Sequence, residues 1–165
     1  MTVTIDLEQP GDEAAIEAVT RDAFSTAAYA DGHEPLIPGR LREAGALGLS
    51  LVARDGEALV GHIAFSPVTL PTPGHWFGLG PVSVLSERQG GGIGARLVED
   101  GLARLRENGA AGVTLIGDPA FYGRFGFRPH AGLSYGEVPA PYVLALSFDD
   151  GEPTGAIGYH RAFDA

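Results

Sequence analysis

The sequence predicts an α/β fold in which a mixed β-sheet carries helices on its faces. Two observations support this: strand-like and helix-like segments do not alternate strictly, and a glycine-rich turn joins one predicted strand directly to a long helix. A chain of 165 residues, of which 44% are hydrophobic, is long enough to bury one core. We therefore expect a single domain that spans residues 1–165.

The predicted elements follow from the spacing of apolar residues along the chain. Strands are expected at residues 2–7, 47–54, 58–68, 76–85, 112–117, 142–148 and 155–163. Helices are expected at residues 11–24 and 39–45 and from the glycine-rich turn to Asn108, with a helical turn or short helix at 118–127.

Local turn and capping residues support several of these boundaries. Asp12 is available as the N-cap of the first helix, and the Asp55-Gly56 pair indicates a hairpin turn between two strands. Gly109 suits the stop after the long helix, and Pro119 suits the first position of a short helix.

The composition excludes several classes of protein. The formal net charge is −10, so the overall field disfavours binding to nucleic acid and mildly attracts cationic molecules such as amines. All 11 basic residues are arginine, which excludes a catalytic lysine, and the 0 cysteines exclude thiolate chemistry. No apolar run is long enough to cross a membrane, and the first residues lack a secretory signal pattern. We therefore expect a cytoplasmic protein. We also expect no metal site, because the 5 histidines show no ligand spacing.

The stretch RQGGGIGARL, residues 88–97, places four glycines just before a helical pattern. Such a turn leaves main-chain N–H groups free at a helix start, where the helix dipole adds positive charge. Both features suit a phosphate group. A tight corner without a ligand would need only one or two glycines.

Two other phosphate-binding patterns compete for this stretch. The nucleotide P-loop is excluded because its lysine is missing. The dinucleotide fingerprint is formally satisfied by Gly90, Gly92 and Ala95, with Asp118 after the next strand. Pro81 argues against it, because a central parallel strand tolerates a missing N–H poorly.

A third pattern fits the stretch together with its neighbours. Residues 89–94, QGGGIG, match Q-x-x-G-x-G, and the segments LGPVSVL before it and GDPAFYGRFGF after it stand in the corresponding order and spacing. In this combination the chain resembles the GNAT (GCN5-related N-acetyltransferase) superfamily, in particular the bacterial YhbS-like predicted N-acetyltransferases.

The resemblance implies a mostly antiparallel sheet of six to seven strands, splayed at a central parallel pair, with helices on both faces. Acetyl-CoA would lie in the gap as cosubstrate, its pantetheine arm beside the main chain of residues 82–84 and its pyrophosphate on the amides of residues 89–95. Pro81 is then acceptable, because the strand ladder is already interrupted there. The implied cofactor-binding residues are Val82, Ser83, Val84, Gln89, Gly90, Gly91, Gly92, Ile93, Gly94 and Ala95. Arg88 is a candidate for extra positive charge at the rim, unless it is simply solvated.

The resemblance also implies a general acid. Tyr122, in DPAFYGRFGF, matches the tyrosine with which many members protonate the leaving CoA sulfur. A phenol with an ordinary pKa of about 10 carries its proton at neutral pH. The alternative interpretation of Tyr122 is a half-buried aromatic residue in the core. For the developing oxyanion, the resemblance implies a main-chain N–H near Val84 as the donor.

The general base is not determined by the pattern. His62 is the candidate that we place in the catalytic group, because it alternates with small residues on its predicted strand, although a lone strand histidine often has a structural role. His33 and Glu34 lie in the loop after the first helix, and His75 and His160 have weaker support. Ser83 is a poor base, and removal of the proton through ordered water stays open.

The leading hypothesis is an acetyl-CoA-dependent N-acetyltransferase that acts on a primary amine of a small molecule or peptide by direct attack. The alternatives are a non-catalytic acyl-CoA-binding or regulatory module and, less favoured, a protein that binds a nicotinamide dinucleotide. The late strands could also pair with a second copy in a homodimer. Two residues depart from the common pattern: Ser86 stands where proline is frequent, and Asp118 where asparagine is frequent.

Overall fold

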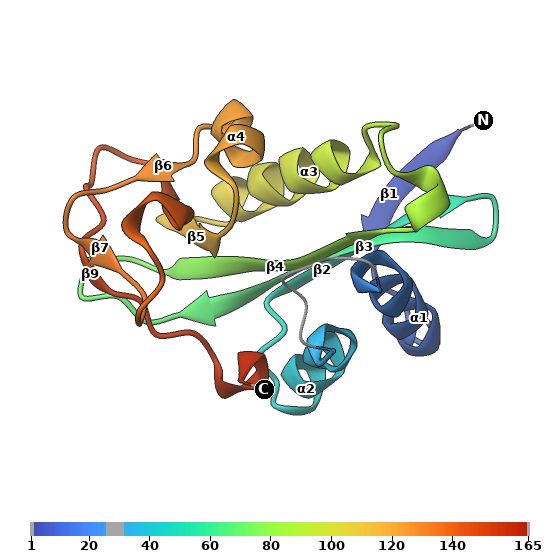
Figure 1. Cartoon of the computed structure of the whole chain (residues 1–165). Coiled ribbons are helices and arrows are strands. Elements are labelled where there is room, and N and C mark those ends of the chain that lie inside the picture. Colours follow the sequence, from blue (N-terminus) through green and yellow to red (C-terminus); the bar gives the residue numbers. More distant parts are fainter. Residues whose placement is uncertain (1, 26–31, 165) are drawn as a thin grey trace. The chain divides into compact units, whose positions relative to one another are not determined.

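The computed structural model describes residues 2–25 and 32–164. The helices are α1 (Glu13–Phe24), α2 (Ile37–Glu43), α3 (Ile93–Glu107) and α4 (Pro119–Tyr122). The strands are β1 (Val3–Leu7), β2 (Leu49–Asp55), β3 (Ala58–Val68), β4 (Trp76–Val84), β5 (Gly112–Ile116), β6 (Arg128–Pro129), β7 (Leu133–Ser134), β8 (Val143–Ser147) and β9 (Gly155–Ala156) (Figure 1).

Seven strands share one sheet in the order β1-β2-β3-β4-β5-β8-β6, and β7 pairs with β9 in a separate two-stranded sheet. In the large sheet β4 and β5 run parallel, whereas β1–β2, β2–β3, β5–β8 and β6–β8 run antiparallel. The parallel register extends from Trp76↔Gly112 to Gly78↔Thr114, although β4 continues to Val84. The predicted fold class, a mixed and mostly antiparallel sheet with a central parallel pair, is confirmed.

The chain forms two compact units. The first comprises residues 1–66, 80–101 and 160–165, and the second comprises residues 67–79 and 102–159. Strands β3 and β4 and helix α3 each contribute residues to both units.

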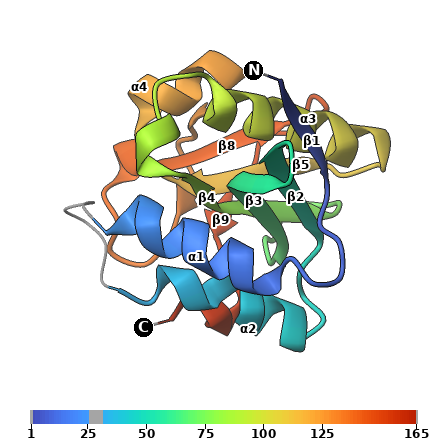
Figure 2. The same ribbon diagram turned by 90° about the vertical axis from the view of Figure 1, so that its right-hand side faces the viewer.

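In the first unit, the two faces of the sheet are covered by different helices. Helices α1 and α2 lie side by side on one face, and the first turns of α3 lie on the other (Figures 1 and 2). Side chains alternate along β3, so Gly61 and Phe65 face α3 whereas His62 faces the opposite side. A methyl group at Gly101 of α3 would meet the ring of Phe65 at 2.3 Å, which explains a glycine in mid-helix.

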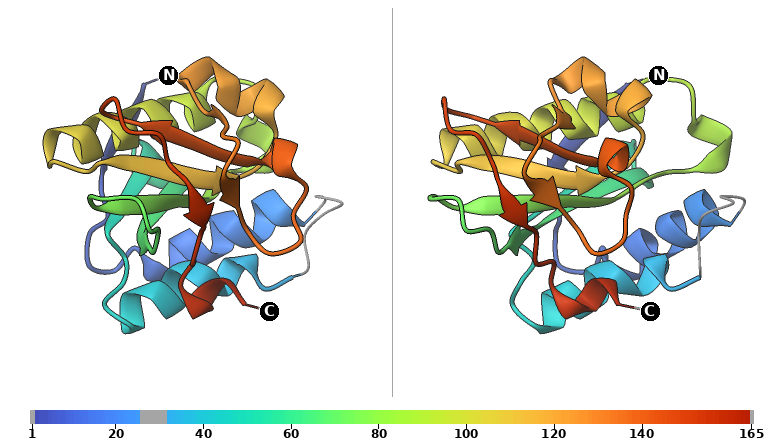
Figure 3. Two further views of the ribbon diagram at one scale, coloured as in Figure 1. Left: turned by 90° about the vertical axis from the view of Figure 1, so that its left-hand side faces the viewer. Right: turned by 60° about the vertical axis from the view of Figure 1, so that its left-hand side comes forward.

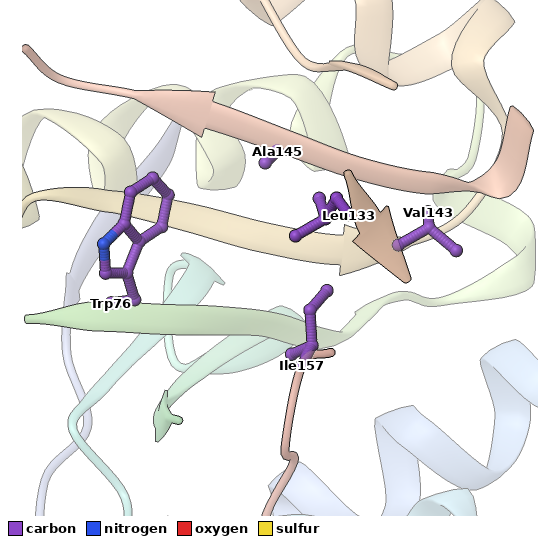
Figure 4. Close-up of a cluster of buried hydrophobic side chains, with 5 residues drawn as sticks. All are labelled: Trp76, Leu133, Val143, Ala145 and Ile157. Carbon is purple, nitrogen blue, oxygen red and sulfur yellow. The ribbon is translucent and has the colours of Figure 1, made fainter. Parts of the chain in front are cut away.

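The second unit is built around β5. Strand β5 pairs with β8 from Gly112↔Ser147 to Ile116↔Val143, and the two strands appear as adjacent yellow-orange and red-orange arrows in Figure 3. A hydrophobic cluster fills this unit (Figure 4). Its buried members are Trp76, Leu133, Val143, Ala145 and Ile157. The indole ring of Trp76 lies against Gly112, where a Cβ would be only 2.4 Å away.

The prediction of a strand at residues 155–163 was wrong. Of residues 155–163 only Gly155–Ala156 pair as a strand, and Gly158 makes a single bridge to Thr69 before a 3-10 turn at Arg161–Phe163. The positive φ of Gly155, 103°, and the N-cap bond from Ala162 N–H to His160 Nδ1 prevent a continuous strand. Alternation of apolar residues could not reveal either feature.

Smaller deviations also have local causes. Helix α1 begins at Glu13, but the carboxylate of Asp12 does not cap it, because it accepts bonds from Gln9 N–H and from Arg54 instead. Helix α2 begins at Ile37, two residues before the predicted start, with Pro38 in its first turn. The hairpin at Gly56 and the stop at Gly109 are confirmed, with φ of 62° and 86°.

The close approach of Gly101 to Phe65 gives a testable prediction. Gly101→Ala favours the helix by about 1 kcal/mol, because alanine has the higher helix propensity. Its methyl group, however, would overlap the ring of Phe65, which has 0% exposure. We expect net destabilisation of about 1–2 kcal/mol, measured by urea unfolding, since overpacking typically costs about 1–3 kcal/mol. In a Phe65→Ala background the same change should be stabilising, and a double-mutant cycle without coupling would contradict the explanation.

Candidate functional site

The glycine-rich stretch connects the end of β4 to α3 by a 3-10 turn at Ser86–Arg88. Gly90 and Gly92 have φ of 85° and 86°, a left-handed backbone that favours glycine. Gly91 and Gly94 differ from them, because a Cβ there would lie 3.6 Å from Arg88 O and 3.7 Å from Val84 Cγ2, which are ordinary contacts. The protein alone therefore does not require glycine at residues 91 and 94.

The main-chain amides of this stretch are available to a ligand. Within the described part of the chain, the N–H groups of Gly90 through Ala95 donate no hydrogen bond, and the first helical bond runs from Arg96 N–H to Gly92 O at 3.1 Å. The amide of Gln89 is engaged, since it donates to Ser86 O at 3.4 Å. Free donors at the start of a 15-residue helix create a local positive potential that suits an anion.

The last residues of β4 lead directly into this stretch. Val84 directs its side chain toward Gly94 of α3, so Ser83 faces the opposite side of the sheet. The carbonyl of Val84 accepts a hydrogen bond from Gln89 Nε2 at 3.1 Å. Ser83 is 1% exposed, and its Oγ has no hydrogen-bond partner in the described part of the chain. The Gly80–Pro81 peptide bond just before these residues is cis.

The residues around the stretch are held by charged partners. Arg88 Nη1 contacts Asp55 Oδ2 at 3.1 Å, so this arginine is anchored to the β2–β3 hairpin rather than merely solvated. Ser86, which departs from the common pattern, donates its N–H to Asp22 Oδ2 of α1 at 2.7 Å. The other departure, Asp118, caps α4 by accepting from Ala120 N–H at 2.9 Å.

His62 of β3 is fully buried in the first unit. Its Nε2 lies 2.8 Å from Ser50 Oγ, and its Nδ1 has no partner among the described residues. Burial lowers the pKa of His62 to about 4, against a smaller raising effect of Glu8. The ring is therefore neutral at physiological pH.

Tyr122, the predicted general acid, lies in the second unit as the last residue of α4. Its half-buried ring meets Phe121 edge-on with centroids 4.9 Å apart, and Phe127 at 6.0 Å. A Cβ at Gly117 would lie 2.8 Å from the ring, so the glycine after β5 makes room for it. Packing thus orients the ring through its apolar edges.

Three of the remaining candidate bases have structural partners. His33 Nε2 donates to Phe163 O at 2.8 Å, and His160 Nδ1 accepts from Ala162 N–H at 2.9 Å. Glu34 accepts from Gly32 N–H at 3.1 Å at the start of a 3-10 turn. His75 directly precedes β4 and is exposed.

Two polar residues that the sequence did not single out complete the surroundings of His62. Glu8 follows β1, and Ser50 lies in β2 beside Leu51 and Val52, which have 0% exposure. A serine in an apolar strand was the only signal in the sequence, and strand pairing was needed to bring it to His62. Among the described residues no cluster of three or more acidic or histidine side chains could hold a metal ion. No helix in the described ranges is long and apolar enough to cross a membrane.

The mixed sheet and the free amides at the start of α3 define an α/β protein with a helix N-terminus that is suited to an anionic group. Comparison with known proteins narrows this class. Residues 11–130 match the acetyltransferase (GNAT) domain family. The sequence is 41% identical over 168 residues to the uncharacterized N-acetyltransferase YhbS of Escherichia coli K12, covering 97% of this chain and 98% of YhbS. The chain belongs to the GNAT acetyltransferase family.

Two solved structures are similar over nearly the whole chain. A GNAT acetyltransferase from Brucella melitensis in complex with acetyl-CoA has a TM-score of 0.88 at 45% identity, covering 99% of each chain. E. coli YhbS in complex with CoA has a TM-score of 0.90, with 34% identity in the superposition, and covers 99% of this chain and 92% of YhbS.

The buried His62 gives a prediction about acid stability. Its pKa falls from 6.5 to about 4 on folding, so the unfolded chain binds an extra proton between these pH values. The stabilising contribution is full above pH 6.5 and is lost as the pH falls toward 4, by about 3 kcal/mol. In His62→Gln, urea unfolding should show a correspondingly weaker pH dependence, with exposed His75→Gln as the control. Parallel curves for wild type and His62→Gln would refute this.

Proposed function

We propose that the protein transfers the acetyl group of acetyl-CoA to a primary amine of a small molecule or peptide. The observation that carries this proposal is the row of free amides from Gly90 to Ala95 at the start of α3. Relatives at 45% and 34% identity were crystallised with acetyl-CoA and CoA, which supports the same ligand here.

The cofactor-binding residues are proposed to act mainly through their main chain. The amides of residues 90–95 would hold the pyrophosphate, and Gly91 and Gly94 would leave room for it. We infer that the main-chain groups of Val82 and Val84 face the pantetheine arm. The carbonyl of Val84 is capped by Gln89 Nε2, so a ligand N–H at this carbonyl would share or replace that bond.

The chemistry needs a neutral amine, a donor for the developing oxyanion and a proton for the departing sulfur. When bound, acetyl-CoA supplies an acetyl thioester. The amine nitrogen forms the new C–N bond, the C–S bond breaks, and we propose that the Tyr122 phenol gives its proton to the sulfur. The oxyanion donor is proposed to be a main-chain N–H near Val84.

An amine acceptor agrees with the charge of the protein. The net charge of −10 favours the approach of a cation. A groove of about 340 Å³ in the first unit is lined by Glu13 and Glu17 of α1, by Arg42 of α2, which is paired with Glu8, and by the apolar side chains of Ile16, Pro35 and Pro38. We propose this groove for the acceptor, with carboxylates for an ammonium group and an apolar wall for the carbon chain.

Binding can be tested with a glycine that has room for a side chain. Saturating acetyl-CoA should raise the Tm of the wild type, because it binds the folded state. Gly94→Val should fold and lose this shift, since its side chain would point into the proposed pyrophosphate position. Gly39→Val, in helix α2 with similar open space, is the matched control that keeps the shift. An undiminished shift in Gly94→Val would reject the proposed cofactor position.

The role of Tyr122 can be tested by removing its hydroxyl group. Tyr122→Phe keeps the ring packing against Phe121 and Phe127, so the acetyl-CoA shift should persist. Turnover, measured as release of free CoA thiol, should fall by about 100-fold, the lower range for a positioned acid. Tyr142→Phe, at a 49% exposed tyrosine, is the control. Wild-type turnover in Tyr122→Phe would remove the assignment, and binding without thiol release from any amine would favour a non-catalytic acyl-CoA-binding module.

A further inference from the structure

The 3-10 turn before the glycine-rich stretch is capped by a residue of another element. Its own N-cap position is Leu85, whose side chain has no hydrogen-bond acceptor. Asp22 of α1 fills this role, because its Oδ2 accepts from Ser86 N–H at 2.7 Å across 64 positions of the sequence. Ser86 Oγ also lies 3.3 Å from the main-chain oxygen of Asp22. In Figure 2 the light green turn lies beside the end of α1 that provides this cap.

Helix α1 gains nothing from an aspartate at this position. Asp22 lies in the last turn of α1, where the helix dipole places partial negative charge. A cation is favoured there and a carboxylate is disfavoured. The role of Asp22 is therefore found in the turn that it caps and not in its own helix.

The capped turn is the fixed segment from which the free amides start. Three bonds tie it to its surroundings: the cap from Asp22 at 2.7 Å, the ion pair of Arg88 with Asp55 at 3.1 Å, and the bond from Gln89 Nε2 to Val84 O at 3.1 Å. Residues 90–95 follow directly, and within the described ranges their N–H groups donate no hydrogen bond. Glycine-rich backbone has the most conformational freedom to lose, so an anion binds it more tightly when the segment before it is already ordered.

We propose that Asp22 is a positioning residue for the cofactor, because its bond to Ser86 N–H orders the turn that presents the amides of residues 90–95. This inference rests on the proposed function, and it adds α1 to the elements that determine the affinity for acetyl-CoA. A carboxylate repels an anion, so Asp22 contributes to this affinity only through the order that it gives the turn.

The first test measures acetyl-CoA binding by isothermal titration calorimetry. Asp22→Ala should raise Kd by about 3–10-fold, the range that corresponds to the loss of one hydrogen bond. Asp22→Asn retains an oxygen acceptor and should restore most of the affinity. Glu87→Ala is the matched control, since it removes an exposed carboxylate from the same turn and leaves the cap in place. Tighter binding in both alanine variants would show that charge repulsion dominates, and would overturn the proposal.

Two changes at Ser86 separate its main-chain donor from its side chain. Ser86→Ala keeps the N–H and should retain the wild-type Kd. Ser86→Pro removes the N–H, and the backbone accepts proline because Ser86 opens the turn and Leu85 before it is extended, with φ of −48° and ψ of 136°. In the Ser86→Pro background, Asp22→Ala should cause no further loss, since the bond is already absent. Equal losses in both backgrounds would contradict the proposed contact.

Kinetics distinguish a positioning residue from a catalytic one. With an amine that the wild-type protein acetylates, Asp22→Ala should raise the KM for acetyl-CoA and leave kcat close to the wild-type value, because saturating cofactor orders the turn by itself. A fall in kcat at unchanged KM would reject the positioning role.

A measurement without ligand keeps the proposal testable if turnover is low. Nitrogen-15 relaxation of the main-chain amides of Gly90, Gly91 and Gly92 should show more motion in Asp22→Ala than in Glu87→Ala or the wild type. Unchanged order at these three amides in Asp22→Ala would contradict the proposal.

The outcomes separate this inference from the function on which it rests. A wild-type protein that binds no acetyl-CoA contradicts the proposed function itself. If the wild type binds acetyl-CoA and a folded Asp22→Ala variant binds it equally well, the role of Asp22 is refuted and the proposed function stands.

Discussion

A buried histidine that stays neutral needs a fixed acceptor for its single N–H, and this requirement organises the first unit. His62 of β3 reaches Ser50 of β2, Ser50 reaches Glu8 at the end of β1, and Arg42 of α2 neutralises Glu8. Three strands and a helix are thereby linked by one polar chain. Because an unsatisfied buried polar group costs more than a satisfied one gains, removing any link affects all the others.

The glycines after β4 serve two different requirements. Gly90 and Gly92 are set by the backbone, because their left-handed φ values would strain any other residue. Gly91 and Gly94 are not set by the backbone or by packing, since a methyl group would fit at both positions. The proposed approach of a ligand to the main chain would account for the second pair. In that proposal one short stretch serves folding through Gly90 and Gly92 and binding through Gly91 and Gly94.

Residues that are close in the sequence were predicted well, and residues brought together by strand pairing were not. Consecutive motifs in the sequence carry a strand, the glycine turn, a helix and the segment with Tyr122. These motifs identified the fold class and the candidate cofactor site. Glu8 and Ser50 carry no motif, and only the register of β1, β2 and β3 brings them to His62. The late strand 155–163 failed for a related reason, because a positive φ at Gly155 and a side-chain cap at His160 override its apolar pattern.

Main-chain recognition explains how a protein with a net charge of −10 can bind an anionic cofactor. The arginines beside the turn are committed elsewhere, Arg88 to Asp55 and Arg96 to the carbonyl of Val3. In the proposed binding mode the attraction comes from amide dipoles and the helix terminus, which act over a few ångströms and need no formal charge. A net negative charge on the protein as a whole is therefore compatible with an anionic group held at this turn.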